Sequence, residues 1–63
     1  SPEDLDVVKK QVIKLLENGD QSSRDILKTI GCSEITLKTV LKLLLEHHII
    51  NITAINTYKL SHL

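Results

Sequence analysis

With 63 residues and a formal net charge of zero, the chain is one small domain without the strong positive charge of tight nucleic-acid binders. Its single cysteine, Cys32, and the lack of any Cys/His ligand spacing exclude a disulfide framework and a metal cluster. A chain of this size buries roughly 60% of its unfolded surface, so its core is only just sufficient.

No apolar run approaches the roughly 20 residues that span a membrane, and the acidic start "SPEDLD" is unlike a signal peptide. We therefore expect an intracellular protein, in the nucleus or cytoplasm, without membrane contact. The abrupt ends of the sequence lead us to expect that these residues are one domain of a larger protein.

The first predicted helix covers the N-terminal segment and ends at Asn18 and Gly19. Ser1 is expected to cap its first turn, with Pro2 at the first helical position, where a missing N–H costs nothing. Gly19 suits the left-handed conformation that closes a helix. The apolar face of this helix consists of Leu5, Val8, Val12, Leu15 and Leu16.

A short second helix begins at Ser22, which forms a capping-box-like start with Asp25, and it ends at Gly31. Its apolar stripe is Ile26, Leu27 and Ile30. Ser33 is expected to cap a third and longer helix, because serine is a favoured N-cap residue.

The third predicted helix runs to His47 or His48 and has two distinct faces. Its core-facing side is expected to hold Leu37, Val40, Leu41, Leu44 and a partly buried His48, with Leu45 at the edge. The opposite arc holds Ile35, Lys38, Thr39, Lys42, Leu43 and Glu46. Lys42 and Glu46 are spaced for an ion pair one turn apart.

After the third helix, the apolar period changes from that of a helix to that of a strand. Ile50, Ile52 and Ala54 are expected on one side, and a turn near residues 55–57 leads back through "TYKL". This is a β-hairpin with a loop of about 2–4 residues, and a very short strand around Gln21 would pair with it. The predicted fold is α+β, a three-helix core with a C-terminal β-hairpin.

Residues at fixed places in the second and third helices resemble the winged-helix variant of the helix-turn-helix superfamily. The matching positions are Leu27, Gly31, Cys32, Leu37 and Val40, with "TYKL" as the returning strand of the wing. The resemblance covers nearly all of residues 1–63 and implies a single winged-helix domain. Leu27 departs from the motif, which usually has Ala or Gly there, so we expect the two helices to cross at a wider separation.

Two subfamilies are similar to this sequence, and the choice between them stays open. "LKTIGCS" resembles the Zα/Zβ domains of double-stranded-RNA adenosine deaminases and poxvirus proteins. Members that bind Z-DNA have an Asn and a Tyr where this chain has Lys38 and Lys42, and a Pro-Pro-x-Trp wing that is missing here. "QVIKLLENG" and "LKTVLKLL" resemble the C-terminal domain of the middle subunit of replication protein A, which binds helices of partner proteins.

The first functional hypothesis is binding of double-stranded DNA or RNA by the third helix and the wing, weak for one domain alone. Hydroxyl groups would donate to phosphates or bases, lysines would neutralise phosphates, and an apolar side chain would contact a thymine methyl group. The predicted contact residues are Ser33, Ile35, Thr36, Lys38, Thr39, Lys42, Asn56 and Lys59. Arg24 and Lys28 on the second helix would contact nearby phosphates.

The second hypothesis is a protein-interaction module without nucleic-acid binding. Ile35 and Leu43 face away from the predicted core of a neutral domain, and exposed apolar groups can mark an interface with a protein partner or a second copy. Catalysis, a cofactor and a metal are not expected. Cys32 falls at a core position, and the adjacent His47 and His48 diverge too far on a helix to share one metal ion.

Overall fold

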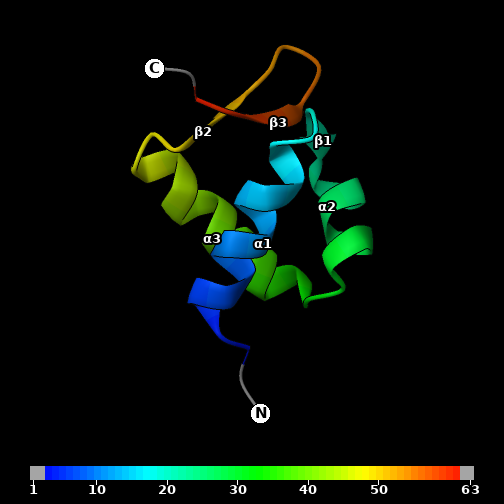
Figure 1. Ribbon diagram of the computed structural model, residues 1–63, viewed down its shortest axis with the longest axis vertical. Coiled ribbons are helices and arrows are strands. Elements are labelled where there is room, and N and C mark those ends of the chain that lie inside the picture. The colour runs from blue at the N-terminus through cyan, green and yellow to red at the C-terminus, as the bar shows by residue number, and fades with distance from the viewer. Residues whose placement is uncertain (1–2, 62–63) are drawn as a thin grey trace.

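The computed structural model describes residues 3–61, which fold into three helices and a small sheet (Figure 1). The elements in chain order are α1 (Leu5–Leu16), β1 (Gln21–Ser22), α2 (Ser23–Ile30), α3 (Glu34–Glu46), β2 (Ile50–Ile52) and β3 (Thr57–Leu60). The predicted α+β class, the order of the helices, the C-terminal hairpin and the short strand at Gln21 are all confirmed. The arrangement has the layout of a winged helix.

The start of α1 differs from the prediction. Asp4 is the N-cap, and its Oδ1 accepts hydrogen bonds from the N–H groups of Asp6, at 2.9 Å, and Val7, at 3.4 Å. The helix therefore begins at Leu5, so the prediction that Pro2 is its first residue is wrong. An Asp carboxylate satisfies two free N–H groups and complements the positive end of the helix dipole. Ser1 and Pro2 themselves lie outside the described residues.

The predicted start and end of α2 and the predicted start of α3 are confirmed. Ser22 Oγ accepts a hydrogen bond from the N–H of Asp25 at 3.1 Å, and Ser33 Oγ accepts one from the N–H of Thr36 at 3.2 Å. Gly31 ends α2 in the left-handed conformation, with φ of 76°, which its lack of a Cβ allows. These local signals fix the turn between the two helices.

The core lies between α1 and α3, and α2 and the sheet close it. Nine apolar side chains are buried there: Val8, Val12, Leu16, Ile26, Leu37, Val40, Leu41, Leu44 and Ile50. Leu5 was expected on the same face of α1, but it is 39% exposed because it lies in the first turn, at the end of the helix. Leu37, Val40, Leu41 and Leu44 of α3 are all buried, as the helical period predicts.

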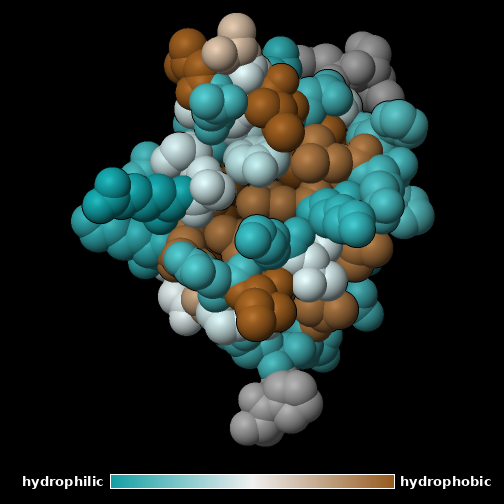
Figure 2. Space-filling model, turned by 180° about the vertical axis from the view of Figure 1, so that it is seen from behind, coloured by the Kyte–Doolittle hydropathy of each residue, from teal (hydrophilic) through white to brown (hydrophobic). Residues whose placement is uncertain are grey.

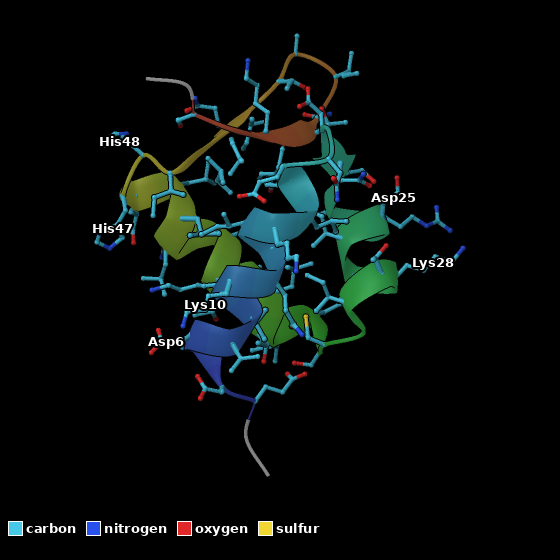
Figure 3. All side chains as sticks on the ribbon, in the orientation of Figure 1. Asp6, Lys10, Asp25, Lys28, His47 and His48 are labelled. Atoms are coloured by element: carbon cyan, nitrogen blue, oxygen red, sulfur yellow. The ribbon has the colours of Figure 1, made fainter. Side chains whose placement is uncertain are left out.

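The end of α3 corrects the prediction for His48. The helix ends at Glu46, and the N–H of His48 then donates to the carbonyl of Leu45 at 3.0 Å, while the N–H of Ile49 donates to that of Leu44 at 2.9 Å. This is a Schellman motif, which places His48 in the left-handed region with φ of 58° and leaves it exposed. Figure 3 shows His47 and His48 at the outer edge of the molecule.

The three strands form an antiparallel sheet in the order β1-β3-β2, so β3 is the central strand. Tyr58 of β3 pairs with Gln21 on one side and with Ile52 on the other. The hairpin loop, residues 53–56, is closed by a 2.8 Å hydrogen bond from the N–H of Thr53 to the carbonyl of Thr57. Ile50 enters the core, whereas Ile52 is 53% exposed because β2 runs outward into the wing.

Candidate functional site

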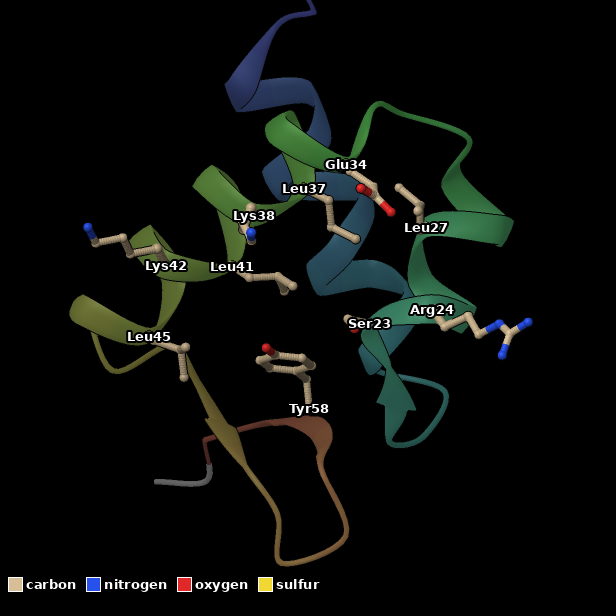
Figure 4. A pocket seen from close by; sticks show the side chains of 10 residues that line it. All are labelled: Ser23, Arg24, Leu27, Glu34, Leu37, Lys38, Leu41, Lys42, Leu45 and Tyr58. Carbon is tan, nitrogen blue, oxygen red and sulfur yellow. The ribbon is translucent and has the colours of Figure 1, made fainter.

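A groove of about 660 Å³ lies between α2, α3 and β3, on the side of α3 that does not face α1 (Figure 4). It is lined by Ser23, Arg24, Leu27, Glu34, Leu37, Lys38, Leu41, Lys42, Leu45 and Tyr58. Its volume falls within the ~300–1,000 Å³ typical of ligand pockets. It is the part of the surface where side chains from three separate elements converge.

The floor of the groove is apolar. Leu37, Leu41 and Leu45 are spaced one turn apart along α3, and Leu27 of α2 lies opposite them. Tyr58 enters from β3 and is the only aromatic residue of the chain. Figure 2 shows this side of the molecule, where a band of apolar side chains runs between hydrophilic ones.

The depth of burial changes across this floor. Leu37 and Leu41 are buried and belong to the core, whereas Leu27, Leu45 and Tyr58 are only half-buried. The groove is therefore an extension of the core that α2, α3 and β3 leave open to solvent. Half-buried apolar side chains that converge in one hollow favour contact with another molecule.

The rim of the groove is mostly basic. Arg24 of α2 and Lys38 and Lys42 of α3 are exposed, and Glu34 is the one acidic residue among the lining side chains. Figure 4 shows Arg24 and Lys42 extending outward on opposite sides of the groove. Three basic side chains against one acidic side chain give the groove a local positive charge in a chain that is neutral as a whole.

The rim cations form no ion pair within the part of the chain that the structure describes. The one ion pair found among residues 3–61 joins Lys9 Nζ to Asp6 Oδ1 at 3.7 Å. The expected pair between Lys42 and Glu46 is thus not formed, and such an exposed pair stabilises a helix by only about 0.2–0.5 kcal/mol. The charges of the rim remain free to interact with a bound molecule.

The hydroxyl groups predicted to contact nucleic acid already have partners. Ser33 Oγ donates to Glu3 Oε1 at 2.8 Å, and the Ser33 N–H donates to both carboxylate oxygens of Glu3, at 3.2 Å and 3.1 Å. Thr36 Oγ1 lies 2.9 Å from Ser33 Oγ, and Thr39 Oγ1 donates to the Ile35 carbonyl at 2.9 Å. A carboxylate therefore occupies the N-terminal end of α3, where a phosphate would otherwise approach.

The same contacts change the titration of Glu3. Hydrogen bonds from the side chain of Thr36, from the side chain of Ser33 and from the Ser33 N–H hold the pKa of Glu3 below its ordinary value. The carboxylate is consequently ionised over a wide range of pH. It tethers the segment before α1 to the start of α3.

The remaining predicted contact residues are spread over different surfaces. Ile35 is 79% exposed, and Lys38 and Lys42 stand beside each other on the groove rim. Lys59 lies on the opposite face of the sheet, because its neighbour Tyr58 points into the groove and side chains alternate along a strand. Asn56 is exposed in the wing loop, with φ of 61°. The structure therefore brings Lys38 and Lys42 together on one surface, but it places Asn56 and Lys59 of the wing elsewhere.

Sequence reasoning placed Ile35 and Leu43 in the alternative protein interface, and neither lines the groove. Leu43 is half-buried, while Ile35 is 79% exposed and lies outside the groove. The groove residues that were missed are Leu27, Leu45 and Tyr58, and Arg24 was predicted only as a phosphate contact. The one signal in the sequence was the place of Leu45 at the edge of the apolar face of α3.

Cys32 is half-buried and packs against the core. Burial raises the pKa of its thiol, and the negative charge of Glu3 adds to this effect, so the reactive thiolate form is disfavoured. Among residues 3–61 no three His, Cys, Asp or Glu side chains gather in a way that could hold a metal ion.

Comparison with known proteins finds no matching family model, no matching curated protein and no matching solved structure. Within the described residues, no helix is both long and apolar enough to cross a membrane.

Proposed function

We propose that this domain is a protein-docking module that holds a segment of a partner protein in the groove between α2, α3 and β3. The observation that carries the proposal is the apolar floor, in which Leu27, Leu45 and Tyr58 are half-buried beside a fully packed core. Burying apolar surface is the main favourable contribution to association, at roughly 25 cal/mol per Å².

The composition of the groove supports a protein ligand. Protein interfaces typically have an apolar centre with aromatic anchors and a polar or charged rim, and Tyr and Arg are enriched among the residues that dominate affinity. Tyr58 and the leucines form such a centre here, while Arg24 and the two lysines form the rim. No polar or charged side chain is buried among the described residues, so the groove lacks the fixed polar groups that usually orient a small molecule.

Selection from a displayed library of helical and extended peptides, with no bias in charge, tests this proposal. Tyr58 is the only tyrosine and the chain has no tryptophan, so peptides without Tyr or Trp allow its fluorescence to report occupancy of the groove. We expect selected peptides to change Tyr58 fluorescence and to lose binding to a Leu27→Asp/Leu45→Asp variant. The control is Val7→Asp, which changes an exposed apolar residue of α1 and should leave binding intact. Failure to obtain any peptide that depends on the groove would reject the proposal.

Binding of double-stranded nucleic acid is a second candidate, favoured by the exposed cations Arg24, Lys38 and Lys42. With three phosphates neutralised at most, the logarithm of the binding constant should fall with the logarithm of salt concentration with a slope of about −3. A titration of labelled duplex DNA at two salt concentrations measures this slope. A Lys38→Glu/Lys42→Glu variant should abolish binding, whereas Lys10→Glu/Lys14→Glu, a pair with the same spacing on α1, should not.

A further inference from the structure

We propose that the occupant of the groove is an amphipathic α-helix of a partner protein, with leucine-sized side chains on one face and Asp or Glu on both flanks. This inference rests on the proposed docking function and goes further by naming the conformation and the charge of the partner segment. Three observations support it: the backbone of the groove walls, the spacing of the floor leucines, and the charge of the rim.

The walls of the groove favour a helix over an extended segment. The backbone groups of α2 and α3 are bonded within their own helices. Tyr58, the residue of β3 that lines the groove, is paired with Gln21 of β1 on one side and with Ile52 of β2 on the other, so the strand presents no free edge there. An extended segment would therefore lie over leucines with its N–H and C=O groups unpaired, which is costly. A helix satisfies these groups internally and presents only side chains to the groove.

The floor has the spacing that a helix requires. Leu37, Leu41 and Leu45 form a row along α3 that extends about 12 Å, or roughly two turns. Such rows pack between rows of side chains spaced three or four residues apart on a facing helix. Leu27 and Tyr58 bound the row on its other side, so the partner helix would rest between α2 and α3.

The rim selects the charge of the partner. Arg24 lies on the α2 side and Lys38 and Lys42 on the α3 side, so a helix in the groove would have cations along both flanks. The structure gives none of the three an ion pair with another described residue. Acidic flanks complement this arrangement, whereas basic flanks would be repelled, and charge complementarity of this kind governs partner choice and association rate.

The test uses three synthetic peptides of about 14 residues, which form roughly four helical turns. All share the same leucine anchors, taken from a selected groove binder, and carry Glu, Gln or Lys on both flanks. Tyr58 fluorescence measures binding to the wild-type chain and to an Arg24→Glu/Lys38→Glu/Lys42→Glu variant, whose three changes are all exposed. We expect the wild type to bind the Glu peptide about tenfold more tightly than the Lys peptide at low salt. The variant should reverse this order.

Two controls are needed. One shows that the effect of the charge changes is specific to the groove, and the other shows that the bound peptide is helical. The Lys10→Glu/Lys14→Glu variant changes two exposed lysines of α1 with the spacing of Lys38 and Lys42, and it should keep the preference for the Glu peptide. A proline placed in the middle of the Glu peptide should abolish binding, because proline breaks a helix. Circular dichroism of the bound peptide should show a gain in helix content.

The outcomes distinguish this inference from the proposed function. Equal binding of all three peptides, with a change in Tyr58 fluorescence, would contradict the preference for an acidic partner but would still support the docking function. Binding that survives the proline would overturn the helical conformation alone. Charge-dependent binding of duplex DNA in place of any peptide would overturn both and favour the second candidate.

Discussion

The two sides of α3 are both apolar, yet only one of them is filled along its whole length. Toward α1, Val40 is 0% and Leu44 is 1% exposed, whereas on the groove side Leu37 and Leu41 are buried but Leu45 is only half-buried. Leu44 and Leu45 are adjacent in the sequence and identical in chemistry. The apolar pattern of a helix therefore shows which side chains can be buried. Which of them are buried depends on the elements that pack against the helix.

The neighbours of α3 explain this asymmetry. α1 packs along one side of α3, while the backbone of α2 packs chiefly against α1 and β1. Leu27 extends from α2 toward the groove, and Tyr58 closes the end near the sheet. The second side of α3 consequently stays open between α2 and β3.

The largest expected effect comes from truncating the filled side. Leu44→Ala should lower the free energy of unfolding by about 3 kcal/mol, since it removes a buried side chain and leaves a cavity. That is a large part of the total of about 3–9 kcal/mol expected for a chain of this length. Urea denaturation followed by circular dichroism measures the loss.

The matched variant on the open side is Leu45→Ala, which should cost about 1 kcal/mol or less because the side chain is already half in water. It should instead weaken the binding of a groove peptide about tenfold. Equal losses of stability for Leu44→Ala and Leu45→Ala would show instead that these two side chains are equally well packed.

The next effect concerns how the start of α3 is held. Ser33→Ala removes the N-cap together with the hydrogen bonds between the Ser33 hydroxyl and Glu3, and it should cost about 1–2 kcal/mol. Ser22→Ala removes the cap of α2, which has no such added contact, and should cost about 1 kcal/mol or less. Thermal unfolding of both variants compares them. A smaller loss for Ser33→Ala than for Ser22→Ala would show that the Glu3 contact contributes nothing.

A smaller effect on stability is expected at the groove rim. Lys38→Glu/Lys42→Glu should change the free energy of unfolding by no more than about 0.5 kcal/mol, because both side chains are exposed and neither forms an ion pair within residues 3–61. Loss of acidic-peptide binding with unchanged stability would assign these lysines to recognition. A marked loss of stability would show that the two lysines support the fold, and it would contradict their role in binding the peptide.

The smallest effect is the pH dependence that Glu3 confers. Its pKa in the folded state is below the ordinary value of 4.5, so its contribution to stability is present above that value and is lost as the pH falls through the folded-state pKa. The stability difference between the wild type and Glu3→Gln should therefore be larger at pH ~7 than at an acid pH below the ordinary value of 4.5. Denaturation at both pH values checks this, and a difference that grows in acid would contradict the hydrogen bonds to Ser33.

Much of the fold could be predicted because its signals are local. Ser22 and Ser33 cap their helices, Gly31 supplies the left-handed turn, and the change of period after α3 predicts the hairpin. Two of the failures also have local causes. Asp4 caps α1, so the helix begins later than predicted, and the Schellman turn removes His48 from the helix whose face it was expected to share.

The candidate site was predicted only in part, because it depends on contacts between distant segments. The exposure of Lys38 and Lys42 followed from the helical period of α3 alone. The groove beside them requires Leu27 and Tyr58, which are far apart in the sequence, to face the same helix. Likewise, nothing local indicates that Glu3 bonds to Ser33, thirty positions later in the chain.

Chemical-shift mapping by NMR tests most directly whether a partner helix binds on the open side of α3. A ¹⁵N-labelled domain is titrated with the selected Glu-flanked peptide. Docking in the groove should give the largest shifts at Leu27, Leu45 and Tyr58, on the three elements that form it, with Lys10 and Lys14 of α1 unaffected. Shifts concentrated on the exposed face of α1, or on α3 around Ile35 with the groove residues unchanged, would contradict it.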